Sequence, residues 1–173
     1  MQSYWWAQAV IYQGERLFTL FENEIETDIL NRGYEEYQQI RIITMMDEHF
    51  FAIALGKSID YLQLFSEYNH IISDIDKLFS LRNIHNLRNK REHDDEYLYP
   101  NGRNVNKRPG FEFVLSGHSG DMTSAYVSPT VYYLGNVEIR SIVKYYKNKI
   151  EEIRSIYDTV IDSLLPDQDD IAE

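Results

Sequence analysis

The chain of 173 residues carries a net charge of −11 and contains no cysteine, which excludes a disulfide scaffold, a thiolate metal site and a cysteine nucleophile. Hydrophobic residues make up 43% and aromatic residues 14% of the chain. That is enough for a core of ordinary size, so we expect one domain over residues 1–173. The negative charge works against a surface that neutralises a long nucleic-acid backbone.

Membrane and export signals are not evident from the sequence. The N-terminal stretch has no basic segment and no uninterrupted apolar run, so we expect no signal peptide. Charged residues interrupt every apolar stretch before it reaches the length of a membrane span. We therefore expect a cytoplasmic protein without membrane contact.

Apolar residues recur every three or four positions through most of the chain, which predicts a mainly α fold. We expect an antiparallel helical bundle of about five helices with a small β-hairpin insertion before the last helix. The first helix is predicted over residues 4–31 and ends at Gly33. The second is predicted over residues 34–55, with its apolar repeat on Tyr37, Ile40, Ile43, Met46, Phe50 and Ile53. Its middle is apolar on nearly all sides except at residues 47–49, so it should lie at the centre of the bundle.

The second half of the chain is predicted to contain three further helices and the insertion. Gly56 should end the second helix, and Ser58 should cap a short helix over residues 59–68. Ser73 should cap a helix over residues 73–99, which Pro100 then ends. Residues 100–135 should form a loop and hairpin, with strands at 111–115, 124–127 and 130–134 and a turn at 116–120. Asn136 should cap a last helix over residues 137–165, followed by an acidic tail over 166–173.

Residues 78–99 bring cationic, imidazole and carboxylate groups together most densely. Leu78, Leu81, Ile84 and Leu87 recur every three residues and predict one apolar helix face. From residue 82 to residue 108 there are seven Lys and Arg against four Asp and Glu, a local balance of +3 within the acidic chain. Such a patch suits one anionic group and would not coat a duplex.

A metal site has weak support. A di-iron bundle needs two Glu-x-x-His pairs on separate helices, and the chain holds one, Glu67 to His70, with no second. The other available ligands are Asp47, Glu48, His49, His85, Glu92 and His93. We therefore expect no metal and no cofactor. For residues 47–49 we expect a polar contact across the bundle or a helical turn that reaches the surface. The alternative is that residues 47–49 form a second wall of a site around His93.

Residues 88–93 read R-N-x-x-x-H, and in a mainly helical chain of this size the pattern resembles the HEPN superfamily. The mark of that superfamily is an Arg, a polar residue beside it and a His four to six residues after the Arg. The resemblance implies a helical bundle that pairs into a homodimer, with motif residues from both subunits facing one cleft. The match covers the organisation of most of the chain, but its specific residues are few.

In catalytic members the chemistry is metal-independent RNA cleavage, in which a ribose 2′-OH attacks the adjacent phosphate. By this resemblance His93 would be the general acid and base, Arg88 would neutralise the phosphorane, and Asn89 would orient the substrate or His93. Substrate-binding charge would come from four further residues, Arg91, Arg103, Lys107 and Arg108. This hypothesis describes an endoribonuclease of toxin or phage-defence type, with RNA as substrate and an antitoxin protein as a partner.

One alternative to catalysis stays open. Opposite charges at i, i+4, such as Arg88 and Glu92, also predict a solvated, ion-paired helix. The chain would then be a non-catalytic helical dimer that binds a protein, RNA or a small anion. Apolar and aromatic positions exceed what one compact bundle covers, with Trp5 and Trp6 near the terminus, so a homodimer is expected on either hypothesis. The insertion is expected to act as a flap that brings Arg103, Lys107 and Arg108 to the same cleft.

Overall fold

The computed structural model describes residues 2–26, 33–92, 112–115, 118–121, 124–128 and 131–164. Within these residues the chain is mainly α-helical, as predicted, with five α-helices and small antiparallel sheets before the last helix. The helices are α1 (Ser3–Glu26), α2 (Tyr34–Leu62), α3 (Asn69–Phe79), α4 (Leu81–Glu92) and α6 (Ile139–Leu164), with a 3-10 turn η2 (Ser66–Tyr68).

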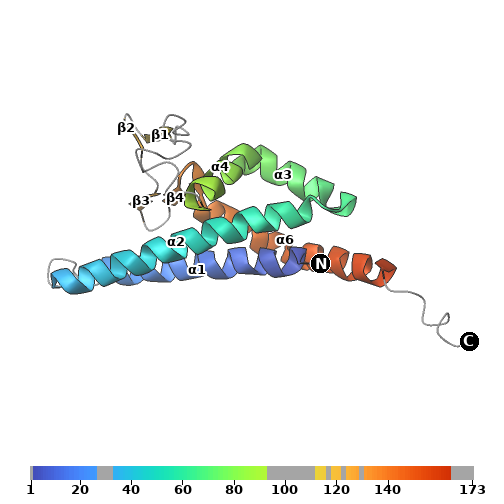
Figure 1. The fold of residues 1–173 in the computed structure, drawn as a ribbon, viewed down its shortest axis with the longest axis horizontal. Helices are drawn as coiled ribbons and strands as arrows, with labels where there is room; N and C mark the ends of the chain where they lie inside the picture. Colours follow the sequence, from blue (N-terminus) through green and yellow to red (C-terminus); the bar gives the residue numbers. More distant parts are fainter. Residues whose placement is uncertain are drawn as a thin grey trace, which may run out of the picture.

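Helix α1 lies against both α2 and α6 along much of its length. Figure 1 shows α1 and α2 side by side as a long hairpin, with α3 and α4 on the far side of α2 from α1. Gly14 permits the close approach of α1 to α6, because a Cβ atom there would lie 2.2 Å from Val143 Cγ2. The first and last helices are therefore in direct contact although they are distant in sequence.

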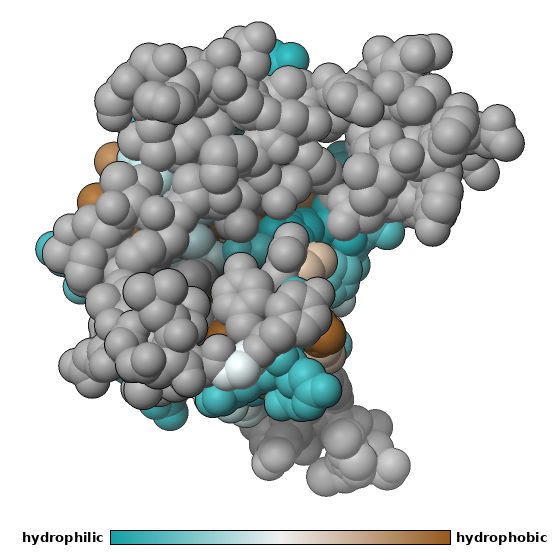
Figure 2. Space-filling model, turned by 90° about the vertical axis from the view of Figure 1, so that its left-hand side faces the viewer, coloured by the Kyte–Doolittle hydropathy of each residue, from teal (hydrophilic) through white to brown (hydrophobic). Residues whose placement is uncertain are grey.

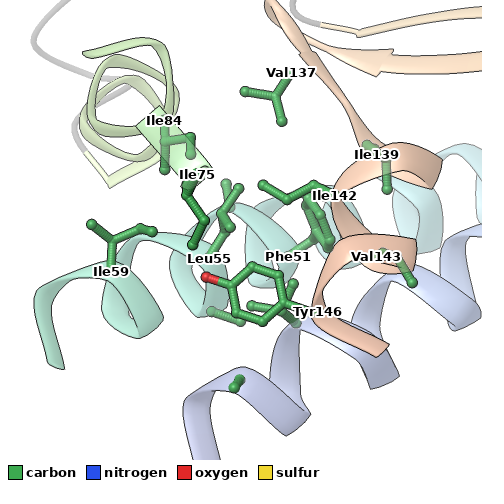
Figure 3. Packing of buried hydrophobic residues seen from close by; sticks show 14 of the residues in the cluster. Phe51, Leu55, Ile59, Ile75, Ile84, Val137, Ile139, Ile142, Val143 and Tyr146 are labelled. Carbon is green, nitrogen blue, oxygen red and sulfur yellow. The ribbon is translucent and has the colours of Figure 1, made fainter. Parts of the chain in front are cut away.

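The hydrophobic core forms where α2, α3, α4 and α6 converge, as Figure 3 shows around Phe51, Leu55 and Tyr146. Tyr68 closes one end of the core. Its hydroxyl is buried, lies 3.0 Å from Ser3 Oγ and donates to the carbonyl oxygen of Ile153. The fully buried members include Ala7, Val10, Leu17, Ile59, Leu62, Ile71, Ile75, Ile84, Leu87, Ile139, Ile142, Val143 and Ile153.

The predicted end of the second helix at Gly56 is wrong. Helix α2 continues to Leu62, and Ser58 is buried inside it instead of capping a new helix. Gly56 is a packing position, because a Cβ atom there would lie 2.2 Å from Arg88 Cδ. A glycine inside a helix costs about 1 kcal/mol relative to alanine, and close packing of α4 on α2 offsets that cost.

The predicted continuous helix over residues 73–99 is also wrong, because the chain breaks at Ser80. Helix α3 starts earlier, at Asn69, and Ser80 has a positive φ of 61°. The Asp76 carboxylate accepts the Leu81 N–H at 2.9 Å and so satisfies the first turn of α4. The break also divides the predicted apolar face: Ile84 and Leu87 are buried, whereas Leu78 is 62% exposed.

The strands before α6 form two antiparallel sheets. Strand β1 (Glu112–Leu115) pairs with β2 (His118–Asp121), so β2 occupies part of the segment predicted as a turn. Strands β3 (Ser124–Ser128), β4 (Val131–Leu134) and β5 (Val137–Glu138) form the second sheet in that order. Buried Tyr132, Leu134 and Val137 attach this sheet to the helical core.

The predicted cap of the last helix is wrong by two residues. Helix α6 begins at Ile139, and Asn136 lies in the turn between β4 and β5 together with Gly135, whose φ is 57°. The Glu138 carboxylate accepts the backbone N–H groups of Arg140 at 3.0 Å and Ser141 at 2.6 Å. A carboxylate therefore caps the helix N-terminus, where the helix dipole favours negative charge.

Candidate functional site

Arg88, the first residue of the R-N-x-x-x-H pattern, lies on the face of α4 that packs against α2. Its Nη1 donates to Asp60 Oδ2 at 2.5 Å and its Nε donates to Glu92 Oε2 at 3.1 Å. Its side chain is 17% exposed. Burial acts against the charged guanidinium, but the carboxylates of Glu92 and Asp60 outweigh that effect and raise the pKa of Arg88. Arg88 is therefore a charged residue held by two carboxylates.

Arg91 lies on the same helix, and its guanidinium points into the protein. It is 8% exposed and donates from Nη2 to Glu48 Oε2 at 2.6 Å. The hydroxyl of Tyr132 donates to the other oxygen of Glu48. Both carboxylate oxygens are thus satisfied, and this buried group joins α2, α4 and β4. RNA binding by Arg91, expected from the resemblance, stays a prediction.

Of the remaining residues of the predicted site, one lies in the described part of the chain and the others lie outside it. Asn89 is exposed on α4, next to Arg88. Four of these residues lie outside the described part of the chain: His93, Arg103, Lys107 and Arg108. The expectation that the insertion brings positive charge to the site therefore stays a prediction. The structure therefore brings Arg88 and Asn89 together at one end of α4 and leaves the complete constellation a prediction.

Asp47 and Glu48 make the polar contacts across the bundle that their apolar surroundings predict. Asp47 is 3% exposed and pairs with Arg16 of α1, whose Nη2 lies 3.0 Å from Asp47 Oδ1. The hydroxyl of Tyr12 and then the charge of Asp47 raise the pKa of Arg16. The two acids point to different neighbours: Asp47 holds α1 to α2, and Glu48 holds α4 and β4 to α2.

The outward side of α2 is the main surprise of the structure. Ile42, Ile43, Met45, Met46 and Phe50 are between 43% and 56% exposed. We call these five residues the α2 apolar face. Ile43, Met46 and Phe50 belong to the predicted apolar repeat of this helix. Helix α2 lies between α1 on one side and α3 and α4 on the other, but these three residues face outward. The side of α2 that packs inward carries Phe51, Leu55, Ile59 and Leu62 instead.

Two shallow depressions flank the ridge that Met46 and Phe50 form on this face. One has a volume of about 340 Å³ and is also lined by Gln13, Arg16, Ile43 and Asp47. The other has a volume of about 360 Å³ and is also lined by Ile42, Met45, His49 and Arg91. Figure 2 shows from one side that brown hydrophobic atoms reach the surface among teal hydrophilic ones. A ridge between two hollows is a shape suited to packing against another helix.

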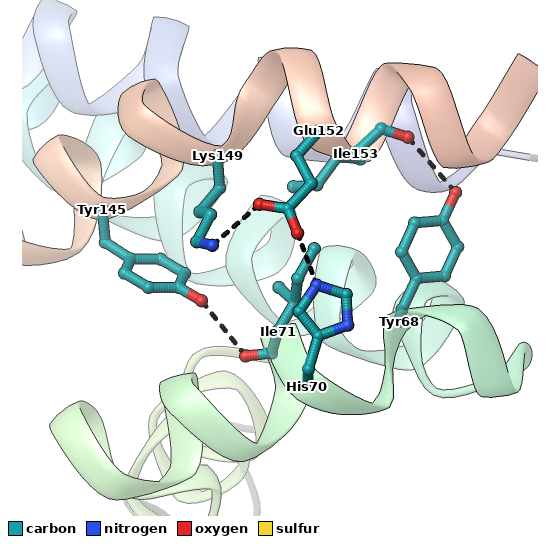
Figure 4. Close-up of polar contacts among 7 residues, drawn as sticks. All are labelled: Tyr68, His70, Ile71, Tyr145, Lys149, Glu152 and Ile153. Carbon is teal, nitrogen blue, oxygen red and sulfur yellow. Dashed lines mark hydrogen bonds and ion pairs between the residues drawn. The ribbon is translucent and has the colours of Figure 1, made fainter.

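A second polar cluster lies between α3 and α6. Figure 4 shows Glu152 between two partners, with His70 Nε2 2.5 Å from Oε1 and Lys149 Nζ 2.7 Å from Oε2. Nearby, the Tyr145 hydroxyl donates to the Ile71 carbonyl oxygen at 3.3 Å, and burial raises the pKa of Tyr145 to about 12. These contacts fasten α3 to α6, and His70 belongs to the single Glu-x-x-His match.

Lys149, followed by His70, holds the pKa of the Glu152 carboxyl below its ordinary value. A lowered folded-state pKa stabilises the fold above the ordinary glutamate pKa of about 4.3, and this contribution is lost as the pH falls through the folded value. We expect Glu152→Gln to lower the Tm at neutral pH and to have a shrinking effect as the pH falls below about 4. Thermal unfolding across pH, with exposed Glu151→Gln as the control, measures this. A difference that grows in acid would contradict it.

Comparisons with protein-family models, with curated proteins and with solved structures find no match to this chain. No helix in the described ranges is both long and apolar enough to cross a membrane. Among those same residues, no group of three or more His, Asp or Glu side chains lies close enough together to hold a metal ion.

Sequence reasoning predicted the pair of Arg88 and Glu92, which the structure shows. It missed the distant partners of Arg88 and Arg91 and the side of α2 that packs inward. A signal for the latter was present, since Phe51, Leu55, Ile59 and Leu62 also recur at helical spacing. Helix α2 therefore carries two apolar stripes. The stripe that packs inward is accompanied by the small residues Ala52, Ala54 and Gly56, which let neighbouring helices approach closely.

Proposed function

We propose that this protein is a non-catalytic helical interaction module that self-associates through the α2 apolar face. One observation carries the proposal: five large apolar side chains lie half-exposed on one side of a long helix whose opposite side is in the core. Contiguous apolar surface of this kind marks interaction sites on soluble proteins. A second copy is an occupant of matching chemistry, because a two-fold interface uses the same patch on both subunits.

The contacts of Arg88 support a non-catalytic function. A guanidinium that stabilises a phosphorane must present free N–H groups to the phosphate. Arg88 instead donates to Asp60 and Glu92, and both carboxylates would repel a phosphate placed beside it.

Light scattering tests self-association directly. We expect the parent protein to show twice the 20.6 kDa chain mass at micromolar concentration, and Met46→Glu to show the single-chain mass, because it places a charge in the centre of the apolar interface. Leu164→Glu is a matched control, since Leu164 is 65% exposed at the end of α6, away from this face. A parent protein that is monomeric at these concentrations would overturn the proposal.

The metal-independent endoribonuclease is the competing hypothesis, and it rests on the R-N-x-x-x-H pattern. It predicts that the purified protein cleaves mixed RNA in excess EDTA and that His93→Ala or Arg88→Ala reduces the rate by about a hundredfold or more. The interaction module predicts no cleavage by the parent, and a lower Tm for Arg88→Ala because Asp60 loses its partly buried partner. Cleavage by the His93→Ala protein at the parental rate would indicate a contaminating nuclease.

A further inference from the structure

We infer that two copies pair antiparallel along α2, with Met46 on the two-fold axis and Glu35 of each copy facing Lys57 of the other. This inference rests on the proposed self-association and adds its geometry and its charge pairing. It follows from the order of residues along the outward side of α2.

Residues of an α-helix are rotated by about 100° from one to the next. Glu35 and Lys57 are each eleven positions from Met46, so both lie within about 20° of it around the helix axis. Glu35 is exposed and Lys57 is half-buried, and neither pairs with an opposite charge among the described residues. The α2 apolar face is therefore flanked on the same side by an acid at one end and a base at the other.

Two copies of α2 match in charge along this face only when the two helices run antiparallel. When Met46 meets its own copy, Glu35 lies opposite Lys57 of the second copy, and Ile42 lies opposite Phe50 of the second copy. A parallel pair in the same register would place Glu35 beside Glu35 and Lys57 beside Lys57, and like charges repel. Charge thus selects the direction, while the apolar side chains supply the contact.

The shape of the face agrees with this pairing. The Met46 and Phe50 ridge has one depression on each side, and each depression is walled by further residues of the α2 apolar face. In an antiparallel pair the ridge of each copy can enter a depression of the other, as ridges enter grooves between packed helices.

Charge exchange tests the pairing. Glu35→Lys or Lys57→Glu alone turns both intersubunit attractions into repulsions, so each should raise the dimer Kd by about tenfold at low salt. The double variant Glu35→Lys/Lys57→Glu restores opposite charges and should return the Kd to within about threefold of the parent. Added salt should lower the dimer Kd of each single variant and raise the dimer Kd of the parent, because salt screens repulsion and attraction alike.

Cross-linking tests the direction, and the absence of cysteine gives a clean background. A Met46→Cys protein should form a covalent dimer on mild oxidation, because the two substituted side chains meet at the axis. A Gln39→Cys protein should not, because position 39 lies opposite position 53 of the second copy. The double variant Gln39→Cys/Ile53→Cys should cross-link again.

The outcomes separate this inference from the proposed function. A monomeric parent overturns both. A dimer in which Gln39→Cys cross-links as readily as Met46→Cys has parallel helices and overturns the antiparallel pairing alone. A dimer that neither charge exchange nor Met46→Cys affects uses another surface, which overturns the pairing and the role of the α2 apolar face.

Discussion

Replacing Glu48 with Ala is expected to lower the free energy of unfolding by about 3–5 kcal/mol, because it leaves the buried Arg91 guanidinium without its counter-charge. The Tyr132 hydroxyl, which also donates to Glu48, loses its acceptor in the same variant. Urea unfolding followed by circular dichroism measures the change. Glu151→Ala, at an exposed position of α6, is the control and should change stability by less than about 0.5 kcal/mol.

The effect of the charges of Glu48 and Arg91 on stability can be measured separately from the effect of the volume that their side chains fill. Glu48→Leu combined with Arg91→Met removes both charges and keeps much of the volume, and such replacements are often neutral or stabilising. We therefore expect the double variant to be more stable than either single variant, with the difference measured as a coupling energy in a double-mutant cycle. A Glu48→Ala protein within about 1 kcal/mol of the parent would show that Arg91 finds another partner or reaches water.

Phe50 and Phe51 offer the second large effect, because these adjacent residues of the same type lie on different sides of α2, one in the core and one exposed. Phe51 is fully buried, and Phe51→Ala should cost about 3–5 kcal/mol of unfolding free energy through lost burial and the remaining cavity. Phe50 is 49% exposed, and Phe50→Ala should cost less than about 1 kcal/mol. Denaturation at low protein concentration is needed, because self-association adds stability that depends on concentration.

The same two variants should have opposite effects on assembly. Phe50→Ala removes an apolar side chain of the α2 apolar face and should shift light scattering toward the monomer while the fold persists. Equal losses of stability in the two variants would contradict the orientation of α2 given by the structure.

Much of the fold follows from the sequence alone. The repeat of apolar residues every three or four positions gives a mainly helical chain, and Gly33 lies directly before α2, where the second helix was predicted to begin. The short β-type runs between residues 111 and 134 were recognisable from β-branched and aromatic residues with intervening glycines. These features are local, because they depend on propensities and turn residues within a few positions of one another.

Helix boundaries were less predictable, because contacts between distant segments override local preferences. Gly56 is a helix terminator by propensity, but here it makes room for the stem of Arg88. Ser80 carries no sequence signal for a break, yet Asp76 caps the helix that starts after it. In both cases a contact with a side chain from another turn or another helix accompanies the departure from the local preference.

The sequence by itself determined the fold class, the acidic charge and the crowding of charged residues near Arg88. Only the tertiary structure decided which of the two apolar stripes of α2 packs inward, and that Asp60 and Glu48 are the distant carboxylates that hold Arg88 and Arg91. Periodicity cannot rank two stripes of similar hydrophobicity. The choice depends on which stripe fits against α1, α4 and α6, and small residues beside Phe51 and Leu55 allow that close approach. The charged partners are 28 and 43 positions away in the chain, so only folding brings them together.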